Sequence, residues 1–409
     1  MLSSLMHHKL TTVLLVLQVT LTCGIGCNVV FMVMQRIDAV TRDTGLVEDG
    51  LSVVHVRDTD KTEDGLAQRS ADLAVLRAVP GVESAVAVEQ DLPFQGSSSS
   101  RTTCASRAGV DTASRNMSSD NTDCMEPNIY GGGPGEIRVL GLRLVEGRDF
   151  LPDEYVDDRP YSQANPTAVI LTRILAERMF PGQDALGHDV YFGDGKPLRV
   201  VGVVDKLVRP RLRSPDEDYL SLLLPTNPGS YWASYALRSA PTDQDRVLRA
   251  ATAALMKLDP DRVLGETHTF AEIRHDYFQG DVTMIGLLVA SLCGLLFVTA
   301  LGIGGLAGFW VQQRARQIGI RRAIGASRGD ILRHFQIENF LIVGAGVVLG
   351  LALAIGLNLM LMRYYGLARL PLGYLPAGAA ALWLLGQLAV LSPASHASRI
   401  PPASAARNV

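Results

Sequence analysis

The amino-acid sequence predicts a membrane protein with four transmembrane helices and one large extracytoplasmic domain of mixed α/β structure. Three observations lead to this fold class: four long apolar stretches without ionisable side chains, one short arginine-rich connecting segment, and a long region in which strand and helix patterns alternate. The composition agrees, because 47% of the residues are hydrophobic and only 19% are charged, whereas a typical soluble domain has roughly 25% charged residues.

Four stretches contain no Asp, Glu, Lys, Arg or His, and each is long enough to cross a bilayer, which takes about 20 mainly apolar residues. They are Leu10–Met34, Thr283–Gln313, Phe340–Met362 and Leu370–Leu391. Buried helices of soluble proteins rarely stay uncharged over this length, so four of them argue against a soluble protein. The first stretch exceeds the roughly 7–15 apolar residues of a cleaved signal peptide, and we expect it to remain as a helix.

The segment between the second and third stretches sets the expected orientation in the membrane. Its part Val311–Phe335 carries six arginines against one acid, Asp330, and short loops with such an excess stay in the cytoplasm. Both termini would then be cytoplasmic. The expected segments are a tail and first helix at 1–34, the outer domain at 35–282, helices at 283–313, 336–362 and 370–391, a cytoplasmic coupling segment at 314–335, and a cytoplasmic tail at 392–409.

The outer region shows alternating strand and helix signals. Runs of branched apolar residues predict strands, apolar residues at helical spacing predict helices, and a Gly-containing turn between two apolar runs predicts a hairpin. Expected strands are 51–57, 82–88 and 168–171, expected helices are 62–79 and 173–180, and the expected hairpin pairs 189–192 with 198–204. Thr242–Asp245 and Thr269–Glu272 each resemble a capping box that opens a helix, and the second helix would run directly into the second span.

A polar segment, Gln95–Gly135, interrupts this pattern and predicts an insertion or a mobile lobe. We interpret Gly131–Gly135, which shows no helix start behind it, as a flexible loop. Cys104 and Cys124 both lie in the segment, on the side of the membrane where disulfides persist, so we expect them to be bonded. The alternative is two free thiols that never meet. Cys23, Cys27 and Cys293 fall in the apolar stretches and are interpreted as small apolar fillers.

Motifs for catalysis or for metal and nucleotide binding are missing from the sequence. It has no H-E-x-x-H or C-x-x-C pattern and no phosphate-binding G-x-x-x-x-G-K-[ST], and we expect neither catalytic nor cofactor-binding residues. The apolar stretches also lack the ionisable groups that ion-coupled transporters keep in the membrane. Their polar residues, such as Gln18, Thr22 and Asn28, are best interpreted as interhelical hydrogen-bonding groups.

The cytoplasmic segment from Gln313 to Arg333 closely resembles the signature R-x-x-E-I-G-I-R-R-A-x-G-A-S-x-x-D-I of the FtsX/MacB superfamily of ABC-transporter permeases. Gln317 stands where the family commonly has Glu, which removes a possible salt bridge. The resemblance continues in Leu140–Phe150, in Ala168–Asp205 and in the proline- and alanine-rich tail. It implies an outer domain of MacB type and a protein of the bacterial inner membrane.

The resemblance also implies the partners. The expected ones are a dimer of ABC ATPase subunits, a second permease of the same or a sister chain, a periplasmic adaptor, an outer-membrane duct and membrane lipids, with no nucleic acid. ATP and Mg would be bound by the ATPase, and the hydrolysis of ATP would move the outer domain and drive export of a substrate. The residues expected to couple to the ATPase are Arg314, Arg316, Gln317, Ile318, Gly319, Ile320, Arg321, Arg322, Ala323, Ile324, Gly325 and Ala326.

Other functions remain open from the sequence. The arginines could serve only to fix topology and to bind anionic lipid headgroups. The same type of machine could extract lipoproteins from the membrane, as in the related Lol system. The cell-division relative regulates cell-wall hydrolases without transport, although its outer domain is much smaller than the region 35–282. A membrane-anchored sensor without an ATPase would leave the signature in the cytoplasmic segment unexplained.

Overall fold

The computed structural model describes the chain from Lys9 to Ser398 except for short gaps. The gaps lie at residues 60–63, 90–91, 97, 117–122, 159–164, 231, 315–317, 319, 321–323, 326, 366–369 and 372. The chain falls into two compact units: a helical unit made of Met1–Thr41 and Gly280–Val409, and an outer unit made of Arg42–Gln279. The expected outer domain, 35–282, therefore extends a few residues into the helical unit at each end.

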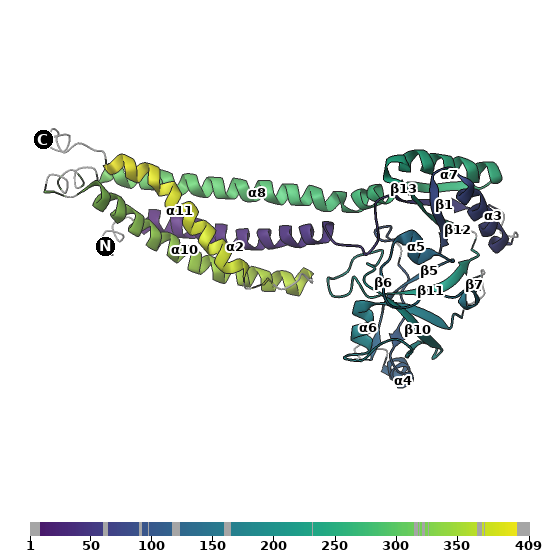
Figure 1. Cartoon of the computed structure of the whole chain (residues 1–409). Coiled ribbons are helices and arrows are strands. Elements are labelled where there is room, and N and C mark those ends of the chain that lie inside the picture. The colour runs from purple at the N-terminus through teal and green to yellow at the C-terminus, as the bar shows by residue number, and fades with distance from the viewer. Residues whose placement is uncertain are drawn as a thin grey trace. The chain divides into compact units, whose positions relative to one another are not determined.

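Four long helices supply the helical unit (Figure 1): α2 (Lys9–Val40), α8 (Phe270–Gln313), α10 (Arg328–Tyr365) and α11 (Tyr374–Ser398). Each is long and apolar enough to cross a membrane by its length and composition. The prediction of four apolar helices is thus confirmed. The helices are longer than the apolar stretches, since α2 continues to Val40 and α10 begins at Arg328 rather than at residue 336.

Small residues allow these helices to approach closely. A Cβ added at Gly346 would lie 2.7 Å from that of Val19, and one at Gly350 would lie 2.4 Å from that of Cys23, so both glycines of α10 leave room for α2. Asn28 of α2 also donates to the Ala354 carbonyl of α10 at 3.1 Å. Close backbone approach with interhelical hydrogen bonds is how helices associate in lipid, where no hydrophobic force joins them.

Hydrogen bonds also join α2 to α8. Gln18 Nε2 donates to the Val298 carbonyl at 3.1 Å, and the hydroxyls of Thr22 and Thr299 lie 2.8 Å apart. The interpretation of Gln18, Thr22 and Asn28 as interhelical hydrogen-bonding groups is therefore confirmed.

The two predicted capping boxes have different outcomes. At the start of α8, the Glu272 amide donates to Thr269 Oγ1 at 3.2 Å and the Thr269 amide donates to Glu272 Oε2 at 2.8 Å, which is the reciprocal pattern of a capping box. The box at Thr242 is wrong. Pro241–Asp243 forms a short 3₁₀ turn there, and the helix that follows starts at Gln244 without a side-chain cap.

One half of the outer sheet is built from two interleaved β-α-β units. Its strand order is β13-β1-β12-β2, and each neighbouring pair is antiparallel. This is the split β-α-β arrangement of ferredoxin-like folds, and two helices pack on one face of it over a shared apolar core. The elements are β1 (Leu51–Arg57), α3 (Gly65–Ala78), β2 (Val82–Val88), β12 (Trp232–Ser239), α7 (Gln244–Leu258) and β13 (Val263–Thr269).

The chain between β2 and β12 extends the same sheet in the order β5-β11-β8-β10-β9-β3-β4. The predicted strand at 168–171, the helix after it and the hairpin of 189–192 with 198–204 are confirmed. The elements are β3 (Thr103–Cys104), α4 (Arg107–Asn116), β4 (Cys124–Met125), β5 (Asn128–Gly132), α5 (Glu136–Leu140), β6 (Leu144–Gly147), β7 (Val156–Asp158), β8 (Ala168–Thr172), α6 (Arg173–Met179), β9 (Asp189–Phe192), β10 (Pro197–Val204) and β11 (Ser221–Pro228).

The interpretation of Gly131–Gly135 as a flexible loop is wrong for Gly131 and Gly132, and helix α5 begins directly behind this run, at Glu136. Gly131 and Gly132 belong to β5, which is buried along its whole length and pairs in parallel with β11. A Cβ on Gly131 would lie 2.2 Å from Glu89 Oε2, and one on Gly132 would lie 2.6 Å from Glu136 Cδ. These glycines are therefore needed because two carboxylate side chains pass close to the strand.

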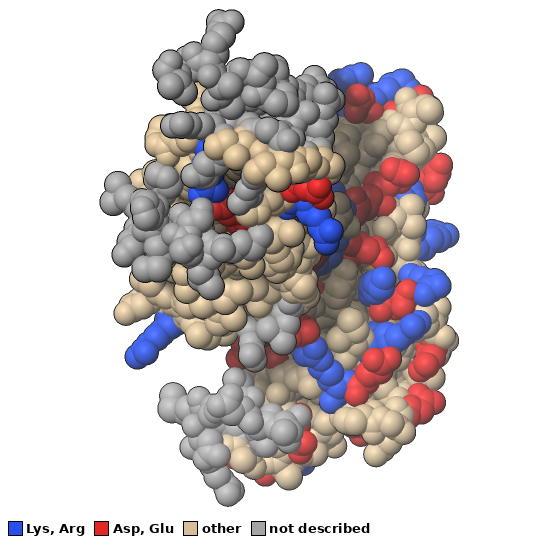
Figure 2. Space-filling view, turned by 90° about the vertical axis from the view of Figure 1, so that its left-hand side faces the viewer, with Lys and Arg blue, Asp and Glu red and all other residues tan. Residues whose placement is uncertain are grey.

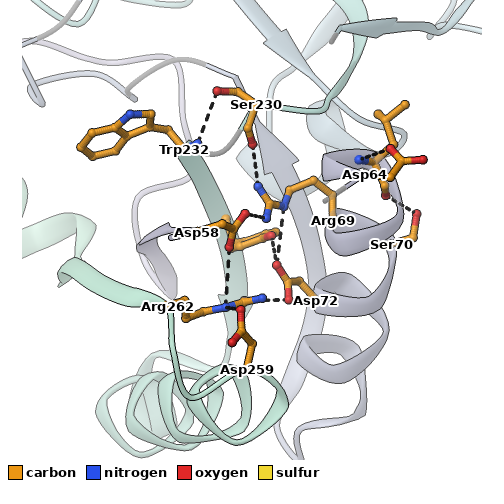
Figure 3. Close-up of polar contacts among 11 residues, drawn as sticks. Asp58, Asp64, Arg69, Ser70, Asp72, Ser230, Trp232, Asp259 and Arg262 are labelled. Atoms are coloured by element: carbon orange, nitrogen blue, oxygen red, sulfur yellow. Dashed lines mark hydrogen bonds and ion pairs between the residues drawn. The ribbon is translucent and has the colours of Figure 1, made fainter. Parts of the chain in front are cut away.

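A buried ionic cluster joins the elements of the first half-sheet (Figure 3). Arg262, before β13, contacts Asp72 of α3 at 2.8 Å, and Arg69 of α3 pairs with Asp58 at the end of β1. The Tyr235 hydroxyl of β12 donates to Asp72. All four charged side chains are at most 7% exposed, so removal of one partner would leave a buried charge uncompensated.

On the surface seen in Figure 2, acidic and basic side chains are interspersed and are not collected into a broad region of one sign. This agrees with the small formal net charge of -3. Long-range electrostatic attraction of a highly charged partner needs a large field of one sign. The described residues of the face in Figure 2 form no such field.

Candidate functional site

The segment between α8 and α10 contains the residues expected to couple to an ATPase. The structure describes five of the twelve, namely Arg314, Ile318, Ile320, Ile324 and Gly325. The other seven lie outside the described residues: Arg316, Gln317, Gly319, Arg321, Arg322, Ala323 and Ala326.

The described backbone of this segment is helical, and the last helical turn ends at a glycine. The amide of Ile318 donates to the Arg314 carbonyl at 2.9 Å, and the amide of Ile324 donates to the Ile320 carbonyl at 3.1 Å. Gly325 has a φ of +106° and no atom within 4 Å of a would-be Cβ. Its role is therefore conformational, because side chains other than glycine rarely adopt this backbone geometry.

A capping box begins α10 directly after this turn. The Ser327 amide and hydroxyl donate to Asp330 Oδ2 at 3.0 and 2.7 Å, and the Asp330 amide donates to Ser327 Oγ at 3.2 Å. An acidic side chain also interacts favourably with the positive end of the helix dipole. The lone acid of the arginine-rich segment is thus explained by helix capping.

Arg314, directly after α8, forms an ion pair with a residue of α10. Its Nη1 lies 2.8 Å from Glu338 Oε2 and 3.2 Å from Glu338 Oε1, and the two side chains are only 16% and 10% exposed. Sequence reasoning missed Glu338, although an acid at the edge of an apolar helix is a signal for a paired cation. The pair holds the start of the coupling segment against the bundle, so a contact of Arg314 with an ATPase would have to share this side chain.

The isoleucines of the segment divide between interior and surface. Ile318 is 6% exposed and belongs to the apolar cluster of the helical unit that includes Ile331 and Phe335. Ile320 is 50% exposed and Ile324 is 82% exposed. Of the described isoleucines, Ile318 is therefore not accessible to a partner, whereas Ile320 and Ile324, one helical turn apart, are.

The two outer cysteines lie at the end of the sheet. Cys104 of β3 and Cys124 of β4 are directly paired in the strand register and are joined by a disulfide. Both are buried, together with Val110 of α4. Closing a loop of this length stabilises a domain by about 3 kcal/mol in the chain-entropy picture, and here it fixes the short β3–β4 pair against β9.

Two family models match this chain. The MacB-like periplasmic core domain matches residues 17–260, more than half of the 409 residues, and the FtsX-like permease C-terminal region matches residues 289–402. The chain belongs to the FtsX/MacB family of ABC-transporter permeases. The first match covers most of the outer unit, and the second includes α10, α11 and the coupling segment.

Curated relatives of this permease include the macrolide export ATP-binding/permease protein MacB of Shewanella sp. (strain W3-18-1), 26% identical over 295 residues, which are 68% of this chain and 42% of the relative. The chain is also 24% identical to the uncharacterized ABC transporter permease YknZ of Bacillus subtilis (strain 168), over 69% of this chain and 70% of the relative. The chain thus spans less than half the length of the MacB protein.

Among solved structures, the periplasmic region of MacB from Actinobacillus actinomycetemcomitans matches 58% of this permease and 97% of that chain, with 16% identity and a TM-score of 0.36. The extracellular domain of YknZ from Gram-positive bacteria matches 52% of this permease and 100% of that chain, with 15% identity and a TM-score of 0.33.

Proposed function

We propose that this chain is the permease subunit of an ABC transporter of MacB type, in which ATP hydrolysis by a separate ATPase moves the outer domain and so exports a substrate. The observation that carries the proposal is helix α8. It is one helix from Phe270, directly after the outer strand β13, to Gln313, directly before the coupling segment. At 1.5 Å per residue, its 44 residues make a rod of roughly 66 Å.

A rod of this kind transmits displacement without a path for substrate through the helices. The apolar stretches carry no ionisable group, and the polar side chains Gln18, Thr22 and Asn28 are already used in contacts between helices. Movement of the coupling segment would instead pull on β13 through α8. Substrate would then be displaced on the outer side and never cross among the spans.

The proposed partners follow from this arrangement. A dimer of ABC ATPase subunits, which binds ATP and Mg, would dock on the coupling segment, and a second permease would complete the transporter. A periplasmic adaptor and an outer-membrane duct would carry the substrate onward. We place the outer unit in the periplasm and both termini in the cytoplasm of a bacterium, with the helical unit in the inner membrane, on the strength of the arginine excess at 314–335.

The test is the docking of the ATPase on Ile320. The variant Ile320→Asp places a carboxylate where an apolar groove of the ATPase would close over it, and an unpaired buried charge costs about 3 kcal/mol or more, which is at least a hundredfold in affinity. Ile320 is half exposed in the permease, so its own fold should tolerate the change. Co-purification of the ATPase and ATP turnover of the complex should both fall.

The control is Gly329→Asp. It adds the same charge nine positions along the chain, in the exposed first turn of α10, where an added Cβ would lie 3.7 Å from the nearest atom, Ser327 Oγ, and where a negative charge is favoured by the helix dipole. This variant should retain the ATPase. Equal retention in both variants would show that this segment is not the contact.

A further inference from the structure

The outer unit contains a cleft that the proposed coupling does not use. Its volume is about 650 Å³, within the range of roughly 300–1,000 Å³ that is typical of small-molecule sites. Its walls come from β1, β12, β13, the first turns of α8 and the loop after β2. The sheet face concerned is opposite to the one that α3 and α7 cover, since His55 alternates with the core residues Val54 and Val56 of β1.

Aromatic side chains form the apolar part of the cleft. Phe94 and Tyr277 line it with ring centroids 5.1 Å apart, and Phe94 also lies 4.9 Å from Phe278. Phe94 has a φ of +72°, a geometry that is costly for a bulky residue and that persists where the surroundings enforce it, frequently at ligand sites. The ring is 3% exposed, so it is a fixed base for the cleft.

Trp232 forms the exposed wall, and its ring is already in contact with a cation. The residue is 56% exposed, and the Arg57 guanidinium carbon lies 4.7 Å from the ring centroid. Figure 3 shows how the turn before it is held: Arg69 donates to the Ser230 carbonyl at 2.8 Å, and the Trp232 amide donates to Ser230 Oγ at 3.3 Å. Arg69 of the buried ionic cluster thus helps to position the backbone that carries the Trp232 indole.

The polar part of the cleft is acidic. Glu89, Glu266 and Asp276 line it, and none of the described lining residues is Lys or Arg. Burial and the neighbouring Asp158 carboxylate raise the pKa of Glu89 to about 7. Glu266 on β13 and Asp276 on α8 are both exposed.

Hydrogen bonds fix the orientation of one lining imidazole. The amide of Leu92 donates to Gln95 Oε1 at 2.7 Å, which fixes the orientation of that side-chain amide. Gln95 Nε2 must then donate to His55 Nε2 over 2.7 Å, and the proton on His55 Nδ1 is donated to Ser234 Oγ at 2.8 Å.

We propose that this cleft binds a monovalent organic cation with an apolar or aromatic body. The faces of Trp232 and Tyr277 attract a cation through their ring quadrupoles. The carboxylates of Glu266 and Asp276 supply negative charge that balances the charge of the cation. An anion would meet the carboxylates of Glu89, Glu266 and Asp276, and none of the described lining residues is Lys or Arg. Binding of the cation requires only residues of the outer unit. Its test is therefore independent of the proposed coupling to an ATPase.

The test titrates the full chain, purified in a neutral detergent without ATPase, with benzyltrimethylammonium in a calorimeter. Benzyl alcohol and benzoate are the matched neutral and anionic probes with the same ring. The cation should bind with one site per chain and at least tenfold more tightly than either control probe. Equal binding of all three probes, or saturable binding of none, overturns the proposal.

The residues are tested with variants at exposed positions, which should fold normally. Glu266→Gln combined with Asp276→Asn should weaken binding of the cation at least tenfold, and Trp232→Ala should weaken it several-fold. Glu177→Gln removes the same type of charge from α6, outside the cleft, and should leave the affinity unchanged. A double variant that binds as tightly as Glu177→Gln would also overturn the proposal.

Discussion

Among single residues of the outer unit, Glu136 has the most unusual environment. It is 4% exposed and its Oε1 has no hydrogen-bond partner in the described structure. Burial, with smaller contributions from the carboxylates of Asp149 and Glu89, raises its pKa to about 8. The folded state therefore keeps this proton through the pH range in which an unfolded chain, with an ordinary glutamate pKa of about 4.3, has lost it.

This environment makes a prediction about stability and pH. Below about pH 4.3 both states hold the proton, and from there to about pH 8 the unfolded state alone is ionised, so stability falls as pH rises. Glu136→Gln cannot ionise. Its stability relative to the unmodified chain should increase from pH 5 to pH 8 by several kcal/mol, at roughly 1.4 kcal/mol for each pH unit.

The measurement is the thermal unfolding midpoint of the outer unit in the full chain at pH 5, 6.5 and 8. Glu177→Gln serves as the control, because Glu177 is exposed and its replacement should shift the midpoint little at any pH. A difference between Glu136→Gln and the unmodified chain that is the same at all three pH values would mean that Glu136 is ionised in the folded protein.

At the scale of elements, the proposed mechanism makes mechanical coupling depend on α8. The boundary between the two units falls at Gln279 and Gly280, inside this helix. A Cβ on Gly280 would meet no atom within 4 Å, so Gly280→Ala should strengthen the helix by up to about 1 kcal/mol. Gly280→Pro removes the hydrogen bond to the carbonyl four residues earlier and kinks the helix at a cost of about 3 kcal/mol.

We expect the two variants to separate ATP hydrolysis from motion of the outer unit. Both should assemble with the ATPase and hydrolyse ATP, since Gly280 is far along the helix from the coupling segment. Only Gly280→Ala should show an ATP-dependent change in the pattern of limited proteolysis of the outer unit. An unchanged ATP response in Gly280→Pro would mean that α8 is not the transmitting element.

Local signals were sufficient to predict several of these elements. The capping box at Thr269 involves side chains three positions apart, and the hairpin of β9 and β10 closes over a short turn. The position of β5 could not be predicted in this way. Its register with β11 joins Asn128 to Ser221, and its glycines are required by Glu89 and Glu136, so their role is visible only in three dimensions.

The same reasoning explains what was missed at the candidate site. An arginine-rich segment predicts topology by its charge count, which treats each arginine as a free cation. Arg314 instead pairs with Glu338, 24 positions later, and Ile318 is buried among the helices. The coupling role of this segment stays a prediction, and the division of its side chains between interior and surface follows from packing.

At the scale of the whole molecule, the account depends on topology. The outer unit and the coupling segment must lie on opposite sides of the membrane, because only then can a helix between them carry movement from an ATPase to the outer side. The arginine excess at 314–335 predicts the cytoplasmic side for the coupling segment. The disulfide of Cys104 and Cys124 agrees with an oxidising compartment for the outer unit.

Labelling of single cysteines in intact cells tests this claim most directly. Asp245→Cys on α7 and Ile324→Cys in the coupling segment both replace exposed residues, in a background with Cys23, Cys27 and Cys293 changed to Ala. A maleimide that passes the outer membrane but not the inner one should label position 245 in intact cells and position 324 only after the inner membrane is permeabilised. Labelling of position 324 in intact cells, with position 245 protected, would contradict the account.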